Sequence, residues 1–79
     1  MLPKPKPGCY YCTGQSPVMF MKVLKVTGGR WGRVYFIDNY NPKNKNQWSY
    51  LTDWKKDLRS GAIQPAPVHS AMRALGELK

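Results

Sequence analysis

Apolar and polar positions alternate along two stretches that flank a pair of glycines. Residues 18–26 and 33–38 are rich in β-branched and aromatic side chains, a composition typical of strands. Between them lies Thr-Gly-Gly-Arg-Trp-Gly, in which both Gly28 and Gly29 can adopt the positive φ of a two-residue hairpin turn. The pattern therefore predicts a β-hairpin with its tip at these two glycines.

Counting outward from this tip predicts which side chains share a face of the hairpin, because directly opposed residues point the same way. One face is wholly apolar and is the predicted core: Met21, Val23, Val34 and Phe36. The other face mixes aromatic and aliphatic side chains with two cations: Phe20, Lys22, Leu24, Val26, Trp31, Arg33, Tyr35 and Ile37. A one-residue shift would bury both cations unpaired, at a high cost in free energy, so the apolar face supports this register.

A third strand is predicted after a polar, Asn-rich loop at residues 39–46. Alternation resumes at residues 47–52, where Trp48 and Tyr50 fall on one side. Three strands that follow one another through short loops are expected to form an antiparallel meander.

Two helices are predicted in the C-terminal half. The first runs through Arg59, is capped by Thr52 or Asp53, and is ended by Gly61. Its side chains Trp54 and Leu58 lie four residues apart and so share one side.

The second predicted helix spans residues 68–78 and is amphipathic. Val68, Met72 and Leu75 recur at the spacing of one helical face. We expect this helix to pack on one face of the sheet.

The expected fold is therefore a single small α+β domain at residues 9–79: an antiparallel β-meander, open or partly closed into a small barrel, packed by the C-terminal helix. Residues 1–8 are expected to precede it as a flexible, basic, proline-rich arm, since their alternate prolines exclude helix and central strand. A chain of 79 residues leaves no room for a second domain.

Charge narrows the class of partner. Thirteen Lys and Arg against four Asp and Glu give a formal charge of +9, spread along the whole chain. Such a surface attracts polyanions, of which nucleic acid is the commonest; acidic protein surfaces and anionic membrane surfaces meet the same electrostatic criterion. No apolar stretch has the length of a membrane span or a secretory signal, so we expect a cytoplasmic protein with no membrane partner.

The two cysteines, Cys9 and Cys12, have the spacing of a metal knuckle or a redox pair. A redox pair needs a helix directly after it, and residues 13–17 are turn-forming instead. A disulfide is not expected in a reducing compartment.

Zinc needs two further ligands, and His69 with Asp38 or Asp53 are the candidates the chain offers. The separation of Cys12 and His69 along the chain does not by itself indicate a zinc site. The alternative is that both thiols pack as small apolar groups beside the adjacent tyrosines. We therefore expect no metal or other cofactor. If zinc binds, the candidate ligands are Cys9, Cys12 and His69.

Enzyme chemistry has little support. The four carboxylates are scattered through the sequence, no serine has an evident base, and the glycines of residues 27–32 do not have phosphate-loop spacing. We expect a protein that acts by binding.

The candidate binding surface combines cations with aromatic rings, the pattern that holds single-stranded nucleic acid by stacking and phosphate contacts. Its predicted members are Lys22, Arg30, Trp31, Arg33, Tyr35, Lys43, Lys45 and Trp48. The competing interpretation is that a helix covers this face as well and makes its aromatic rings part of the core.

The leading hypothesis is a small, basic, non-enzymatic nucleic-acid-binding accessory protein that acts within a larger complex and favours single strands or RNA. The alternative is a protein-interaction module, such as a small viral-type inhibitor or adaptor, that docks its Trp and Arg surface on an acidic partner protein.

Overall fold

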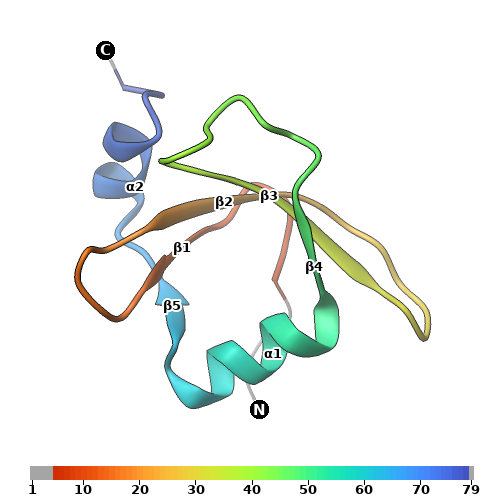
Figure 1. Cartoon of the computed structure of the whole chain (residues 1–79). Coiled ribbons are helices and arrows are strands. Elements are labelled where there is room, and N and C mark those ends of the chain that lie inside the picture. Colours follow the sequence, from red (N-terminus) through yellow and green to blue (C-terminus); the bar gives the residue numbers. More distant parts are fainter. Residues whose placement is uncertain (1–4, 79) are drawn as a thin grey trace.

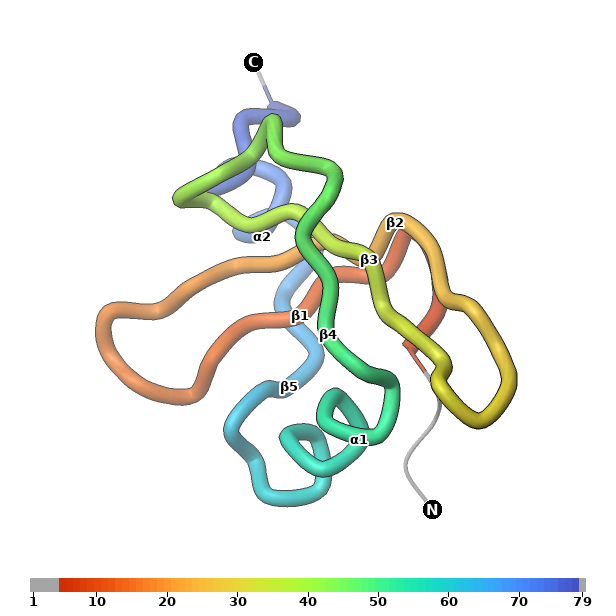
Figure 2. Tube along the Cα trace, turned by 45° about the vertical axis from the view of Figure 1, so that its right-hand side comes forward, coloured from red at the N-terminus to blue at the C-terminus, as the bar shows by residue number. Residues whose placement is uncertain are grey.

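Five antiparallel strands form one curled sheet in the order β4-β3-β2-β1-β5, with a helix on each side of it (Figure 1). The computed structural model describes residues 5–78. The elements are β1 (Tyr10–Thr13), β2 (Phe20–Val26), β3 (Arg33–Asp38), β4 (Trp48–Tyr50), α1 (Leu51–Ser60), β5 (Ile63–Pro65) and α2 (Val68–Ala74). The curled sheet forms a half-barrel around α1 (Figure 2). The predicted α+β class is confirmed, with β1 and β5 as strands that the pattern did not predict.

The predicted two-residue turn of the β2–β3 hairpin is wrong. Thr27 closes a longer loop: its N–H donates to the Arg33 carbonyl at 2.9 Å, and its hydroxyl oxygen accepts the Arg33 N–H at 2.8 Å. Of the two central glycines, only Gly29 has a positive φ, at 88°. A two-residue turn would place Val26 opposite Trp31. In the structure Val26 lies opposite Val34, three residues further along the chain.

A bulge at Leu24 explains why the predicted core face is nevertheless confirmed. The register shifts between Val23 and Lys25, so Val23 lies opposite Phe36. The bulge also places Val26 on the same face as Val23, which corrects its predicted position on the opposite face. Met21, Val23 and Val34 are buried in this core, and Phe36 packs against it.

Gly32 holds the base of the hairpin loop against α1. Its carbonyl accepts the Leu51 N–H at 2.8 Å, and its N–H donates to the Gly29 carbonyl at 3.3 Å. A Cβ on Gly32 would lie 2.7 Å from the Thr27 carbonyl oxygen, closer than side-chain carbons approach. Glycine is therefore required here for close approach of the backbone.

We expect Gly32→Ala to destabilise the protein by about 1–3 kcal/mol, because the loop must move to relieve the contact. Chemical denaturation followed by circular dichroism measures the change. Gly28→Ala is the matched control, since nothing lies within 4 Å of its added carbon and its φ is not positive. Equal losses from the two substitutions would contradict this account of the loop.

α1 occupies the concave face of the sheet and supplies the centre of the core. Trp54 is 3% exposed, with its ring centroid 5.6 Å from that of Tyr11 and 5.0 Å from that of Phe36. The helix begins after Tyr50 without a side-chain cap, so the predicted caps are wrong, and it ends at Gly61 as predicted, with φ 84°. The core face is thus packed by α1 and not by the C-terminal helix.

α2 lies on the opposite face, over β1 and β2 (Figure 1). Ala71 and the C-cap residue Leu75 are buried, so Leu75 lies on the packed face as predicted, whereas Val68 is 56% exposed and its predicted position on that face is wrong. The helix also ends at Ala74, earlier than predicted.

Part of the predicted N-terminal arm, residues 1–4, lies outside the described residues. The rest of it leads directly into β1: Pro5 is buried, and the Gly8 N–H donates to the Val23 carbonyl at 2.8 Å.

Candidate functional site

The outer face of β3 and β4 carries a continuous group of aromatic and cationic side chains. Tyr50 lies directly opposite Arg33, and Trp48 directly opposite Tyr35, so these four side chains share one face. α2 packs on β1 and β2 and leaves this half of the sheet open. With Trp31 from the hairpin loop, they form a surface that we call the aromatic platform: Trp31, Arg33, Tyr35, Trp48 and Tyr50.

The rings of the platform contact one another and remain accessible. Tyr50 lies between the two indoles, with its ring centroid 6.0 Å from that of Trp31 and 5.0 Å from that of Trp48. Trp31 is 69% exposed, and Trp48 and Tyr50 are each 37% exposed. Exposed rings gathered in one group form the kind of apolar surface patch that often marks an interaction site.

Cations flank every part of this surface. The Arg33 guanidinium lies 4.1 Å from the centroid of the Trp48 ring, within cation–π range. Arg30 lies 5.8 Å from the Trp31 ring, and Lys25 lies 5.8 Å from the Tyr35 ring. Within residues 5–78 the only ion pair is Lys22–Glu77, so these three cations are not neutralised by carboxylates of the described chain.

The platform contains four of the eight predicted binding residues, and a fifth, Arg30, lies beside its Trp31 ring. Arg30, Trp31, Arg33, Tyr35 and Trp48 come together as expected. The alternative in which a helix covers this whole face is wrong for the β3–β4 half and correct for the β1–β2 half, where α2 lies.

Three predicted residues lie elsewhere. Lys43 and Lys45 are exposed in the loop between β3 and β4. Lys22 is on β2 beneath the end of α2, where its Nζ lies 2.8 Å from Glu77 Oε2. Lys25 was missed, because only the bulge brings it opposite Tyr35.

Glu77, in the segment after α2, links that segment to the sheet. Its carboxylate accepts hydrogen bonds from Lys22 and from the Tyr10 hydroxyl. The hydrogen bond from Lys22 and then that from Tyr10 lower the pKa of Glu77, while the same bonds to Glu77 raise the pKa of Lys22 and of Tyr10. Lys22 is thereby paired within the fold, unlike the cations beside the platform.

We expect this ion pair to stabilise the fold at neutral pH and to be lost in acid. Because the folded-state pKa of Glu77 is lowered, its contribution is present above the unfolded value of about 4.3 and disappears as pH falls through the folded value. Glu77→Gln should therefore cost up to about 1 kcal/mol at pH 7, a typical value for a partly exposed pair. The difference in denaturation midpoint between wild type and variant should be larger at pH 7 than at pH 2. An equal difference at the two pH values would rule out a stabilising ion pair.

Asp38, a candidate zinc ligand in the sequence, has its carboxylate engaged in hydrogen bonds within the fold. It is buried, its Oδ1 accepts the backbone N–H groups of Tyr40 and Asn41 at 2.9 and 2.8 Å, and its Oδ2 accepts the Gln47 side-chain amide at 3.0 Å. These bonds use the carboxylate to shape the β3–β4 loop.

The proposed zinc ligands do not converge. Cys9 is exposed, Cys12 is buried within β1, and His69 is exposed on α2. Both cysteines are free thiols, and the extended strand replaces the tight bend that a metal knuckle needs. No group of three or more His, Cys, Asp or Glu side chains that could hold a metal ion occurs in residues 5–78.

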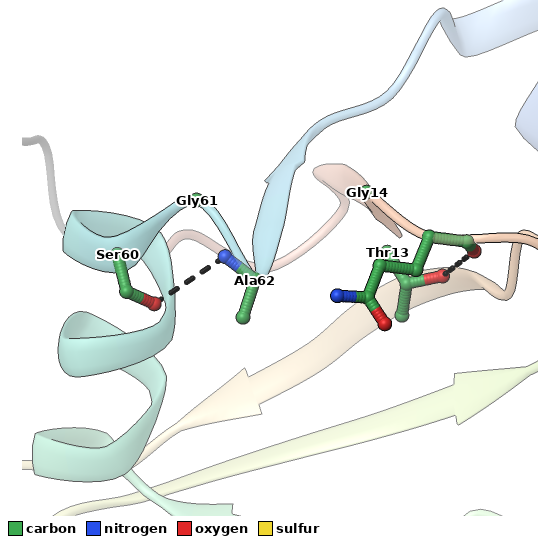
Figure 3. Close-up of a pocket in the computed structure, with 6 residues that line it drawn as sticks. Thr13, Gly14, Ser60, Gly61 and Ala62 are labelled. Carbon is green, nitrogen blue, oxygen red and sulfur yellow. Dashed lines mark hydrogen bonds between the residues drawn. The ribbon is translucent and has the colours of Figure 1, made fainter.

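A shallow groove with a volume of about 490 Å³ lies between the β1–β2 loop and the turn after α1 (Figure 3). Its polar groups bond to one another: the Ala62 N–H donates to Ser60 Oγ at 3.4 Å, and the Gly14 N–H to the Ala62 carbonyl at 3.2 Å. The lining contains no titratable side chain, so it offers no acid, base or activated nucleophile.

The helices of the described chain are too short and too polar to cross a membrane. The platform brings together three exposed rings and neighbouring cations that have no carboxylate partner in residues 5–78. No known protein family, curated protein or solved structure matches this chain.

Proposed function

We propose that the protein binds single-stranded nucleic acid, with RNA favoured, on the aromatic platform, as a non-enzymatic accessory component of a larger complex. The observation that carries the proposal is the exposed chain of rings from Trp31 through Tyr50 to Trp48, with Arg33 stacked on the last of them.

Both parts of a single strand have a complement on this surface. Unpaired bases stack on aromatic rings, each stack contributing about 1–3 kcal/mol, and the platform has exposed rings in Trp31, Tyr50 and Trp48. Phosphates pair with Lys and Arg, and Lys25, Arg30 and Arg33 lie around the rings without carboxylate partners in the described chain. Paired bases in a duplex cannot offer their faces, so the rings favour single strands.

An acidic protein surface is the second candidate partner. Trp, Tyr and Arg are the side chains that dominate protein interfaces, and β4 is an edge strand with one side unpaired in the sheet. The two hypotheses use the same residues but require different partners, so a direct binding experiment separates them.

We expect a fluorescently labelled oligouridine to bind at low salt, with an affinity that falls steeply as salt rises. If the three platform cations each contact one phosphate, log affinity should fall against log salt with a slope of about −2, from about −0.7 per contact on a single strand. Fluorescence anisotropy over a salt series measures the slope. A duplex of the same length should compete poorly.

The absence of binding to any single-stranded oligonucleotide at low salt would refute the nucleic-acid proposal. Binding of an acidic protein in the same assay, blocked by Trp31→Ala, would then favour the second candidate.

A further inference from the structure

The platform has two unlike ends. At one end of β3 the hairpin loop carries Trp31, which contacts Tyr50. At the other end the loop at residues 39–47 joins β3 to β4 and carries Lys43 and Lys45 (Figure 1). Figure 2 shows the same separation of the two loops, with β3 and β4 between them.

The 39–47 loop is held at several points, although it is polar and exposed. Asp38 accepts two backbone N–H groups at its start and the side-chain amide of Gln47 at its end. Asn39 bonds to Phe20 in both directions: its N–H donates to the Phe20 carbonyl at 3.1 Å, and its Oδ1 accepts the Phe20 N–H at 2.8 Å. The buried Asp38 carboxylate accepts these hydrogen bonds from groups of the loop itself and pairs with neither lysine. Lys43 and Lys45 are exposed and have no carboxylate partner in the described chain.

Resting on the function proposed above, we infer that a single strand lies lengthwise along β3 and β4, with bases stacked from Trp31 to Trp48 and the following phosphates on the 39–47 loop. Lys43 and Lys45 are then phosphate-binding residues of the same site, and Asp38 is a positioning residue. The six residues of β3 span about 20 Å, which suits a strand of about four nucleotides or more.

The alternative direction, across the sheet, is obstructed. Beyond β3 on this face, Lys22 is paired with Glu77, and α2 covers β1 and β2. A carboxylate and a helix in that path disfavour a phosphate backbone, whereas both ends of β3 and β4 carry cations.

Two measurements test this lengthwise site. The first is the affinity of the wild-type protein for oligouridines of two, four, six and ten nucleotides at one low salt concentration. We expect affinity to rise steeply from two to about four or six nucleotides and to change little from there to ten.

The second measurement compares Lys43→Ala/Lys45→Ala with Lys55→Ala/Lys56→Ala, a matched double variant on α1, which lies on the other side of the sheet. With Lys43 and Lys45 added to the three platform cations, five phosphate contacts predict a wild-type salt slope of about −3.5 on the ten-nucleotide oligomer, from about −0.7 per contact. We expect the loop variant to lose affinity for this oligomer and to return the slope to about −2. The α1 variant should bind that oligomer with the wild-type salt slope.

If the loop variant matches wild type, or if the dinucleotide binds as tightly as the ten-nucleotide oligomer, the lengthwise site is wrong. The proposed function survives that result provided Trp31→Ala still weakens binding. If no oligomer of any length binds, both the site and the function are refuted.

Discussion

Trp54→Ala is expected to remove a large part of the folding free energy of this protein. Truncating a buried tryptophan costs about 3–5 kcal/mol, against a total of about 4–12 kcal/mol for a domain of this size. Trp54 is the buried residue of α1, and its indole contacts Tyr11 of β1 and Phe36 of β3 on the concave face of the sheet. Urea denaturation followed by far-UV circular dichroism should show a large fall in the transition midpoint.

Trp54→Phe provides the control for the chemistry of this position. The Trp54 indole nitrogen is buried and has no hydrogen-bond partner in the described part of the chain, so phenylalanine loses volume but no hydrogen bond. We expect it to cost clearly less than alanine does. A Trp54→Ala protein as stable as wild type would contradict the placement of α1 on the concave face.

Trp31→Ala is expected to weaken oligonucleotide binding and to leave stability unchanged. Loss of one stacked base costs about 1–3 kcal/mol, or about 5–150-fold in affinity. Its side chain is 69% exposed, so little core packing is lost. Anisotropy titration and thermal denaturation of the same preparation measure the two effects separately.

Val68→Ala is the control for Trp31→Ala, because Val68 is 56% exposed on α2 and lies outside the platform. It should bind as wild type does. Unfolding of the Trp31→Ala protein, or equal loss of affinity in the two variants, would contradict the role given to the platform.

Local alternation was enough to predict the central hairpin and its core face. β3 has the predicted bounds, and Met21, Val23 and Val34 are buried as expected. The exact pairing was not predictable, because Gly28-Gly29 resembles a two-residue turn while the actual closure depends on the Thr27 hydroxyl and the contact of Gly32 with Leu51. Both depend on three-dimensional neighbours and not on turn propensity.

The two strands that the pattern did not predict, β1 and β5, have weak sequence signals. β1 contains Cys12, and the spacing between Cys9 and Cys12 is typical of a metal or redox site and does not indicate a strand. β5 is three residues long and ends at Pro65, a residue that is tolerated in a strand only at an edge or a strand end. These strands form because they pair with β2 and with each other, which is a long-range effect.

The candidate site was predictable where it depends on alternation and not where it depends on packing. Arg33, Tyr35 and Trp48 follow from strand periodicity. The position of α2 decides that Lys22 is engaged by Glu77, and the bulge decides that Lys25 joins the platform. Neither follows from the pattern of a single strand.

The most direct test of the platform as the binding surface uses the protein's three tryptophans in one NMR titration with a short oligouridine. Each indole N–H gives its own signal in a proton–nitrogen correlation spectrum. Trp31 and Trp48 lie on the platform, and Trp54 is 3% exposed in the core as an internal reference. The platform predicts shifts of the Trp31 and Trp48 signals with little change at Trp54, whereas saturable binding that moves only α1 amide signals and leaves both platform indoles unchanged would contradict it.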